Sequence, residues 1–147
     1  MASSKQISTQ LAVVDNLHIF LFNLHGLNQG AALLEHWCTN QVFDILLVQE
    51  HWLAPANFSR LIKITPGYNC IVSSAMEQLC ASTILRGRPF GGLAVILGHR
   101  FRNVTKTVLN TNRVIAVLVS DVLIINIYLP CSTVRNYKEL TLEIIAN

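Results

Sequence analysis

The sequence predicts an α/β fold of the α+β kind, in which one mixed β-sheet is flanked by helices. The segment Phe43 to Gln49 is dominated by Ile, Leu and Val, as expected for a strand that is covered on both faces. Before it, Leu34 and Cys38 share one face of a segment with helical spacing. No internal repeat or linker divides the 147 residues, which predicts a single unit covering residues 1–147.

The predicted elements follow one another closely along the chain. A helix capped by Asn28 follows the first strand, and Leu33, Leu34, Trp37 and Cys38 form its apolar face. A turn or short helix covers Pro55 to Ile64, and a final helix begins at Ser132 or Thr133. The strands are expected at Leu17 to Leu24, Phe43 to Gln49, Tyr68 to Ser73, Gly92 to Leu97, Val104 to Leu109, Val114 to Val119 and Val122 to Tyr128.

The last two strands predict an uncovered sheet face. Val114 to Val119 and Val122 to Ile127 are apolar at nearly every position, so both of their faces are expected to need cover. The chain has helices for about one face only. The other face is therefore expected to be exposed, and the isolated chain to be marginally stable and prone to associate.

The composition argues against a membrane-spanning or a secreted protein. The longest apolar run, Val122 to Leu129, is much shorter than the roughly 20 residues that span a bilayer. Asp15, Asn16 and His18 interrupt the apolar N-terminal segment, so no signal peptide is indicated. The expected location is intracellular, either nuclear or cytoplasmic.

The cysteines and histidines form no metal-binding pattern. The four cysteines lack C-x-x-C spacing, so neither a zinc site nor a disulfide framework is indicated, and buried thiols are expected. The five histidines are each expected to be isolated and exposed. His51 directly follows Glu50, so on a strand the two side chains would point to opposite faces.

A long stretch of the chain is free of acidic residues. Between Gln78 and Ser120 the charged side chains are Arg86, Arg88, Arg100, Arg102, Lys106 and Arg113. This local bias fits a phosphate-rich partner. Equally, these side chains can be charges that keep loops and edge strands soluble.

Three polar side chains stand where apolar runs end, namely Asn23, Glu50 and Tyr128. Strand ends are where α/β proteins present catalytic groups to a cleft. Glu50 is costly to bury unless it is paired or binds a metal ion, and its alternative is a solvated loop carboxylate. Asn23 can instead be a turn residue before Gly26, and Tyr128 an ordinary strand-end aromatic.

These residues belong to three motifs and a glycine pair: Phe22-Asn23-Leu24-His25-Gly26-Leu27-Asn28, Val48-Gln49-Glu50-His51-Trp52, Asn126-Ile127-Tyr128-Leu129-Pro130, and Gly91-Gly92. Their order resembles the first half of the endonuclease/exonuclease/phosphatase superfamily, most closely the endonuclease domain of non-LTR retrotransposons. The segment Arg86 to Gly92 resembles a motif of these endonucleases and argues against the inositol-phosphate and sphingomyelin branches. Two positions depart mildly from the family pattern. Many relatives carry a basic residue at the position of His25 and Trp at the position of Phe22.

The resemblance implies the N-terminal half of a four-layer α/β sandwich and a role for each strand-end residue. Glu50 would bind Mg²⁺ or Mn²⁺, Asn23 would help to fix the metal and phosphate, and Tyr128 would orient the scissile phosphate. Such a set stabilises charge on the phosphoryl oxygens of a phosphodiester. The predicted DNA phosphate contacts are Arg86, Arg88, Arg100 and Arg102.

The resemblance also implies that the site is incomplete, because the Asp-x-Asn and Ser-Asp-His motifs of the family have no counterpart before Asn147. The expected function is therefore a fragment of a Mg²⁺-dependent endonuclease that nicks DNA at a retroelement target site. The fragment is expected to be inactive alone, and a C-terminal half or a reverse transcriptase domain would belong to the parent protein. The alternative is a non-catalytic nucleic-acid-binding or interaction module.

Overall fold

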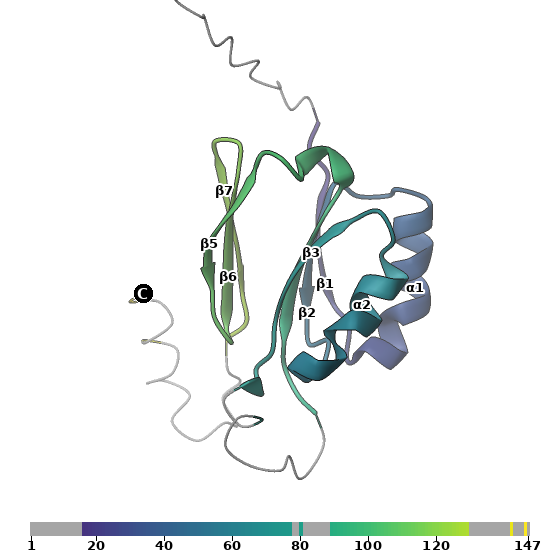
Figure 1. Ribbon diagram of the computed structural model, residues 1–147, viewed down its shortest axis with the longest axis vertical. Coiled ribbons are helices and arrows are strands. Elements are labelled where there is room, and N and C mark those ends of the chain that lie inside the picture. Colours follow the sequence, from purple (N-terminus) through teal and green to yellow (C-terminus); the bar gives the residue numbers. More distant parts are fainter. Residues whose placement is uncertain (1–15, 78–79, 81–88, 130–141, 143–145, 147) are drawn as a thin grey trace, which may run out of the picture.

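The described elements form three layers, with two helices packed on a first sheet that in turn packs on a second sheet (Figure 1). The structure is a computed structural model that describes residues 16–77, 80, 89–129, 142 and 146. The first sheet, sheet A, contains β1 (Ile19–Asn23), β2 (Ile45–Gln49), β3 (Asn69–Ser73) and β4 (Leu93–Leu97). The second, sheet B, contains β5 (Thr105–Asn110), β6 (Val114–Val119) and β7 (Val122–Ile127). The helices are α1 (Leu27–Thr39) and α2 (Phe58–Ile64), with 3-10 turns η1 (Pro55–Asn57) and η2 (His99–Phe101).

The predicted α/β fold with a mixed sheet and flanking helices is confirmed, and the structure adds a second sheet that the sequence did not separate from the first. Sheet A has the order β1-β2-β4-β3, with β1 parallel to β2 and the other pairs antiparallel. Sheet B is antiparallel with the order β5-β6-β7. Ser120 and Asp121 alone connect β6 to β7, with Ser120 at φ 55°, as in a tight hairpin.

Burial on both faces explains why β2 is apolar at almost every position. Leu46 and Val48 pack toward the helices in a core with Leu34 and Leu61. Ile45 belongs to the second core, between the two sheets. Sheet A is therefore the central layer, and β2 and β4 are its covered middle strands.

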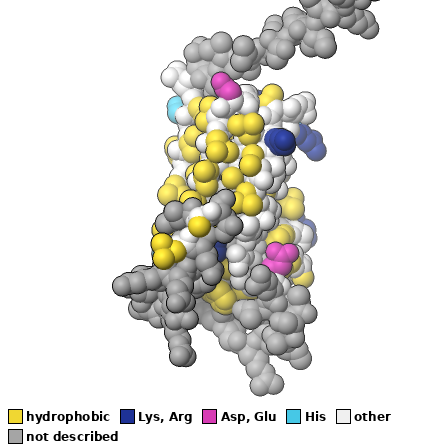
Figure 2. Space-filling model, turned by 90° about the vertical axis from the view of Figure 1, so that its left-hand side faces the viewer, with side chains coloured by type: hydrophobic (Ala, Val, Ile, Leu, Met, Phe, Trp, Pro, Cys, Tyr) yellow, Lys and Arg dark blue, Asp and Glu magenta, His cyan; other side chains and the backbone are white. Residues whose placement is uncertain are grey.

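The outer face of sheet B is exposed along β7, whereas the middle strand β6 is buried at five of its six positions. Along β7 the side chains alternate, so that Ile124 and Asn126 are buried while Leu123, Ile125 and Ile127 are exposed. Figure 2 shows hydrophobic side chains gathered on this outer face. The expected uncovered face is present in the described part of the chain, and it belongs to sheet B.

The start of α1 differs from the sequence prediction. Gly26 is the N-cap residue, and no side chain caps the helix. Asn28 lies inside the first turn, where its Oδ1 accepts a hydrogen bond from Arg60 Nη2 at 2.5 Å. Leu33, expected on the apolar face, is exposed. The predicted final helix from Ser132 or Thr133 lies almost wholly outside the described residues.

The thiols differ in their surroundings. Cys38 is buried, Cys70 is half-buried and Cys80 is exposed, whereas Cys131 lies outside the described residues. Burial raises the pKa of Cys38 to about 12. The expectation of buried thiols is thus wrong for Cys80. Among the described residues no helix is long and apolar enough to cross a membrane.

The alternation along β7 predicts very different costs for two adjacent substitutions. Ile124→Ala should lower the free energy of unfolding by about 2 to 4 kcal/mol, because it leaves a cavity between the sheets, where Ile124 is 6% exposed. Ile125→Ala, at a side chain that is 47% exposed, should cost less than about 1 kcal/mol. Urea denaturation of the two variants measures the difference. Equal losses of unfolding free energy in the two variants would mean that the outer face of sheet B is covered.

Candidate functional site

The carboxyl ends of β1 and β2 meet at one edge of sheet A because the two strands are parallel. Asn23 and Gln49 are register partners at the ends of these strands. Beyond them, Leu24 N–H donates to Gln49 O at 2.9 Å, and Gly26 N–H donates to Glu50 O at 2.7 Å. The backbone pairing therefore continues past the strands and holds Asn23 and Glu50 at the same edge.

Sheet B brings Tyr128 to this edge. Tyr128 follows β7, and its backbone N–H donates to Arg113 O at 3.0 Å. Its hydroxyl donates to Glu50 Oε1 at 2.9 Å. The other carboxylate oxygen, Oε2, lies 3.5 Å from His25 Nδ1. Asn23 Oδ1 accepts the backbone N–H of His25 at 3.0 Å, so the three residues predicted at strand ends are linked directly or through His25.

The loop that carries Glu50 is held in an unusual conformation. Glu50 and Trp52 both have φ of 56°, a left-handed value that costs energy for such side chains. Their backbone N–H groups donate to the carbonyls of Gly92 and Gly91 at 2.8 and 2.9 Å. These contacts fix the direction in which the Glu50 carboxylate leaves the sheet.

His51 is buried, which corrects the expectation that every histidine would be exposed. Its Nε2 lies 3.0 Å from Ser73 O and 3.2 Å from Leu93 O, and its Nδ1 accepts the N–H of Leu53 at 2.9 Å. These contacts require a neutral ring with the proton on Nε2. Burial lowers the pKa of His51, although its contacts with the two carbonyls oppose the shift. The ring anchors the residue that follows Glu50.

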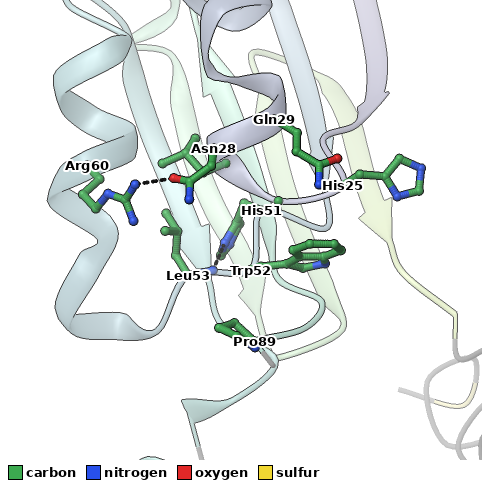
Figure 3. Close-up of a pocket in the computed structure, with 10 residues that line it drawn as sticks. His25, Asn28, Gln29, His51, Trp52, Leu53, Arg60 and Pro89 are labelled. Atoms are coloured by element: carbon green, nitrogen blue, oxygen red, sulfur yellow. Dashed lines mark hydrogen bonds between the residues drawn. The ribbon is translucent and has the colours of Figure 1, made fainter. Parts of the chain in front are cut away.

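A cavity of about 310 Å³ lies beside this edge. It is lined by His25, Gly26, Leu27, Asn28, Gln29, His51, Trp52, Leu53, Arg60 and Pro89 (Figure 3). Asn23, Glu50 and Tyr128 do not line it, but their neighbours do, namely His25, which contacts Glu50, and His51 and Trp52, which follow Glu50 in the chain. The sequence pattern assigned no role to Arg60 or Trp52, because neither directly follows a strand.

Of the four predicted phosphate contacts, the two that the structure describes, Arg100 and Arg102, do not lie at Glu50. Arg100 Nη2 lies 2.6 Å from Asp44 Oδ1, and Asp44 directly precedes β2, whereas Glu50 directly follows it. Arg102 directly follows η2, which contains Arg100. Both arginines are therefore at the opposite end of sheet A from Glu50. Arg86 and Arg88 lie outside the described residues.

Two amides that lie in the sequence motifs, but to which the sequence analysis gave no role, connect the sheets. Asn126 Nδ2 donates to Val48 O at 3.0 Å and to Ala94 O at 3.1 Å. Gln49 Nε2 donates to Ile127 O at 2.9 Å. The sequence feature that could have indicated this role is a polar side chain, Asn126, inside an apolar strand. A buried polar side chain rarely lacks hydrogen-bond partners.

The donor set fits part of a hard-cation site. Glu50 offers carboxylate oxygens and Asn23 an amide oxygen, the types of ligand that Mg²⁺ and Ca²⁺ bind. Within the described part of the chain no group of three or more His, Cys, Asp or Glu residues could hold a metal ion. Mg²⁺ commonly uses only one or two carboxylates together with substrate phosphates. These residues can therefore hold such an ion only with ligands from elsewhere.

Solved structures identify the fold. No family model matches the chain, and no curated protein is significantly similar to it in sequence. It is similar to a variant of the 3′ phosphatase NExo from Neisseria bound to product DNA hairpin, with TM-score 0.56 and 19% identity over 89% of this chain and 49% of that one. It is also similar to an AP endonuclease from Archaeoglobus fulgidus, with TM-score 0.55 and 18% identity over 89% of this chain and 49% of that one. AP endonuclease LMAP from Leishmania major has TM-score 0.58 and 14% identity over 85% of this chain and 43% of that one.

The chain has the fold of these AP endonucleases and of this phosphatase, and it spans about half the length of each. At 14 to 19% identity the likeness establishes the fold.

The packing of His51 on Gly92 predicts a strong effect of one methyl group. A Cβ at Gly92, where φ is 93°, would lie 2.3 Å from His51 Cε1. Gly67 has a similar φ of 83° but open space around it. Gly67→Ala should therefore lower the free energy of unfolding by about 1 to 2 kcal/mol through the backbone alone, and Gly92→Ala by at least about 2 kcal/mol more. Chemical denaturation compares them, and equal losses would refute the role of the His51 ring.

Proposed function

We propose that this chain supplies the first half of the active site of a divalent-metal-dependent phosphodiesterase that cleaves DNA. The observation that carries the proposal is the 2.9 Å hydrogen bond from the Tyr128 hydroxyl to Glu50 Oε1. It joins side chains from two different sheets at one edge, where Asn23 also lies. The structures that share the fold include AP endonucleases and a phosphatase bound to a DNA hairpin.

Each of the three residues has a distinct role in this proposal. Glu50 would hold Mg²⁺ or Mn²⁺, which when bound stabilises negative charge on the phosphoryl oxygens. The Tyr128 hydroxyl limits the movement of the carboxylate, and its single O–H could donate to a phosphate oxygen only after releasing Glu50 Oε1. Asn23 holds the His25 backbone through its Oδ1, and its amide nitrogen is a second donor at the same edge.

The finer proposal is an endonuclease that nicks DNA at a retroelement target site. It rests on the Val48-Gln49-Glu50-His51-Trp52 motif and on the Arg86 to Gly92 segment. Residues 1–147 would be a partial domain, and the Asp-x-Asn and Ser-Asp-His motifs would come from the rest of a parent protein that also carries a reverse transcriptase. On this proposal the chain is inactive alone, because one carboxylate gives only weak metal binding.

A non-catalytic module that binds nucleic acid is the second candidate. The observation in its favour is that the described residues contain no group of three metal-binding side chains. Such a module would use basic side chains and would not need Glu50.

A chimera separates the two candidates. We expect the chain alone not to nick supercoiled plasmid DNA with Mg²⁺ or Mn²⁺. Fused to the second half of the Archaeoglobus fulgidus AP endonuclease, it should nick, because the missing ligands are then present. Glu50→Gln in the fusion should lower the rate by at least about 100-fold, whereas Glu35→Gln, at an exposed carboxylate of α1, should leave it unchanged.

Circular dichroism and thermal melting establish that each fusion is folded before its activity is compared. A folded fusion that binds DNA without nicking it would contradict the catalytic proposal and support the binding module. Robust nicking by the chain alone would contradict the proposal that the site is incomplete.

Salt dependence tests the proposed phosphate contacts Arg86, Arg88, Arg100 and Arg102. Changing all four to Gln should weaken DNA binding and reduce the slope of log affinity against log salt by about one per lost contact. Arg100 should contribute least, since Asp44 already neutralises its charge. The control is Lys63→Gln, at an exposed residue of α2. An unchanged slope in fluorescence anisotropy titrations would make the four arginines solubilising charges.

A further inference from the structure

Two neighbouring cavities lie at the end of sheet A where β2 begins, which is the end opposite Glu50. The smaller, of about 350 Å³, is lined by Gly67, Tyr68, Asn69, His99 and Arg102. The larger, of about 430 Å³, shares Gly67, Tyr68 and His99 with it, and Asp44 and Arg100 also lie in its wall. Neither cavity contains a residue of the Glu50 site, so together they form a separate candidate site.

The pairing of two strands brings the lining residues together. β3 and β4 are antiparallel, and Asn69 at the start of β3 is the register partner of Leu97 at the end of β4. Gly98 alone separates β4 from η2. Arg102 N–H donates to His99 O at 3.1 Å, and side chains three residues apart in such a turn lie on the same side. The turn therefore presents His99 and Arg102 together, next to the start of β3.

The donors at the smaller cavity have no partner in the described part of the chain. The side chains of Asn69, His99 and Arg102 form no hydrogen bond or ion pair with any described residue. His99 and Arg102 are exposed, and Asn69 is half-buried. A guanidinium offers five N–H donors in a fixed fork, and an amide and an imidazole add further donors. Since the described lining includes no acidic side chain, this cavity suits an anion.

The neighbouring arginine is already occupied. Arg100 Nη2 lies 2.6 Å from Asp44 Oδ1, and the guanidinium carbon of Arg100 lies 4.7 Å from the centre of the Phe101 ring. The Arg100 charge is thus balanced within the protein. Asp121, in the hairpin between β6 and β7, forms no ion pair with Arg102. Of the two arginines in this segment, Arg102 is therefore the one whose charge is available to a ligand.

We propose that the smaller cavity binds the phosphate group of a nucleotide through Arg102, His99 and Asn69. A guanidinium binds two phosphate oxygens at once in a fixed geometry. The Tyr68 ring lines both cavities, and Phe43 supports it, with the two ring centroids 5.1 Å apart. An aromatic ring held in this way is a surface on which a nucleobase stacks.

The ligand is therefore a phosphate ester with an aromatic base, either free or part of a nucleic-acid strand. The phosphate lies in the smaller cavity and the nucleoside in the larger one. The inference goes beyond the proposed function, because this site needs neither Glu50 nor a metal ion.

Titration of the purified chain with adenosine 5′-monophosphate in EDTA tests the site. Calorimetry measures the affinity, and the backbone amide resonances of Tyr68, Asn69 and His99 should shift while that of Gly26 does not. Arg102→Gln should weaken binding at least about tenfold, because it removes a charged hydrogen-bond donor. Arg102→Lys keeps the charge but loses the fork, and it should weaken binding at least about threefold.

Lys106→Gln is the matched control, because it removes the same charge from an exposed residue of β5. It should change the affinity less than about twofold, since a charge outside the cavity is screened by salt. Urea denaturation establishes that the variants are equally folded. Equal losses in Arg102→Gln and Lys106→Gln, resonance shifts confined to the Glu50 edge, or no saturable binding below about 10 mM would overturn the inference.

Further ligands identify the source of the phosphate. Adenosine should bind at least about tenfold more weakly than the monophosphate, because it lacks the charged group, and equal binding would contradict the inference. A DNA strand of about eight nucleotides that binds at least tenfold more tightly than the monophosphate, and loses this in Arg102→Gln, would assign the site to nucleic acid. Equal affinities would assign it to a free nucleotide. Glu50→Gln should leave all these affinities unchanged, so failure of the proposed function would not affect the result.

Discussion

The geometry at Glu50 depends on one buried amide. Asn126 is 1% exposed in the apolar interface between the sheets, and its Nδ2 donates to Val48 O and Ala94 O. A buried amide without partners costs about 1 to 3 kcal/mol, so only a placement of sheet B that satisfies it is stable. Tyr128 lies two residues after Asn126, and Glu50 lies two residues after Val48. The alignment that satisfies the amide therefore also brings the tyrosine hydroxyl to the carboxylate.

Further contacts make this edge rigid. Gln49 donates to Ile127 O and ties the two strand ends a second time. The left-handed residues Glu50 and Trp52 store strain that the surrounding contacts must balance. His51, between them, supplies three polar contacts from a buried ring. A loop restrained in this way presents its carboxylate in one direction, which is what metal or phosphate binding requires.

Apolar runs in the sequence located β2, β4 and β6, which are buried at almost every position. They also located β7, although it is exposed on its outer face. The sequence also predicted that Asn23 and Glu50 stand at strand ends, and the parallel pairing of β1 with β2 places them at one edge. Burial of His51 could not be predicted, because its carbonyl partners are 22 and 42 residues away and its space depends on Gly92. The partner of Arg100, 56 residues distant, was hidden for the same reason.

The two ends of β2 differ in their charged side chains, and under the proposed function this difference limits how a nucleic acid could use them. Asp44 and its partner Arg100 are at one end, and Glu50 is at the other. The six residue steps from Asp44 to Glu50, along the five-residue strand β2, separate the two carboxylates by about 20 Å at roughly 3.3 Å per residue. Successive phosphates of one DNA strand advance about 3.4 Å along the helix axis. If DNA ran along β2 in the proposed function, a strand with one phosphate at Glu50 would reach Arg100 about six nucleotides away, so this arginine would contact flanking DNA and not the reacting phosphate.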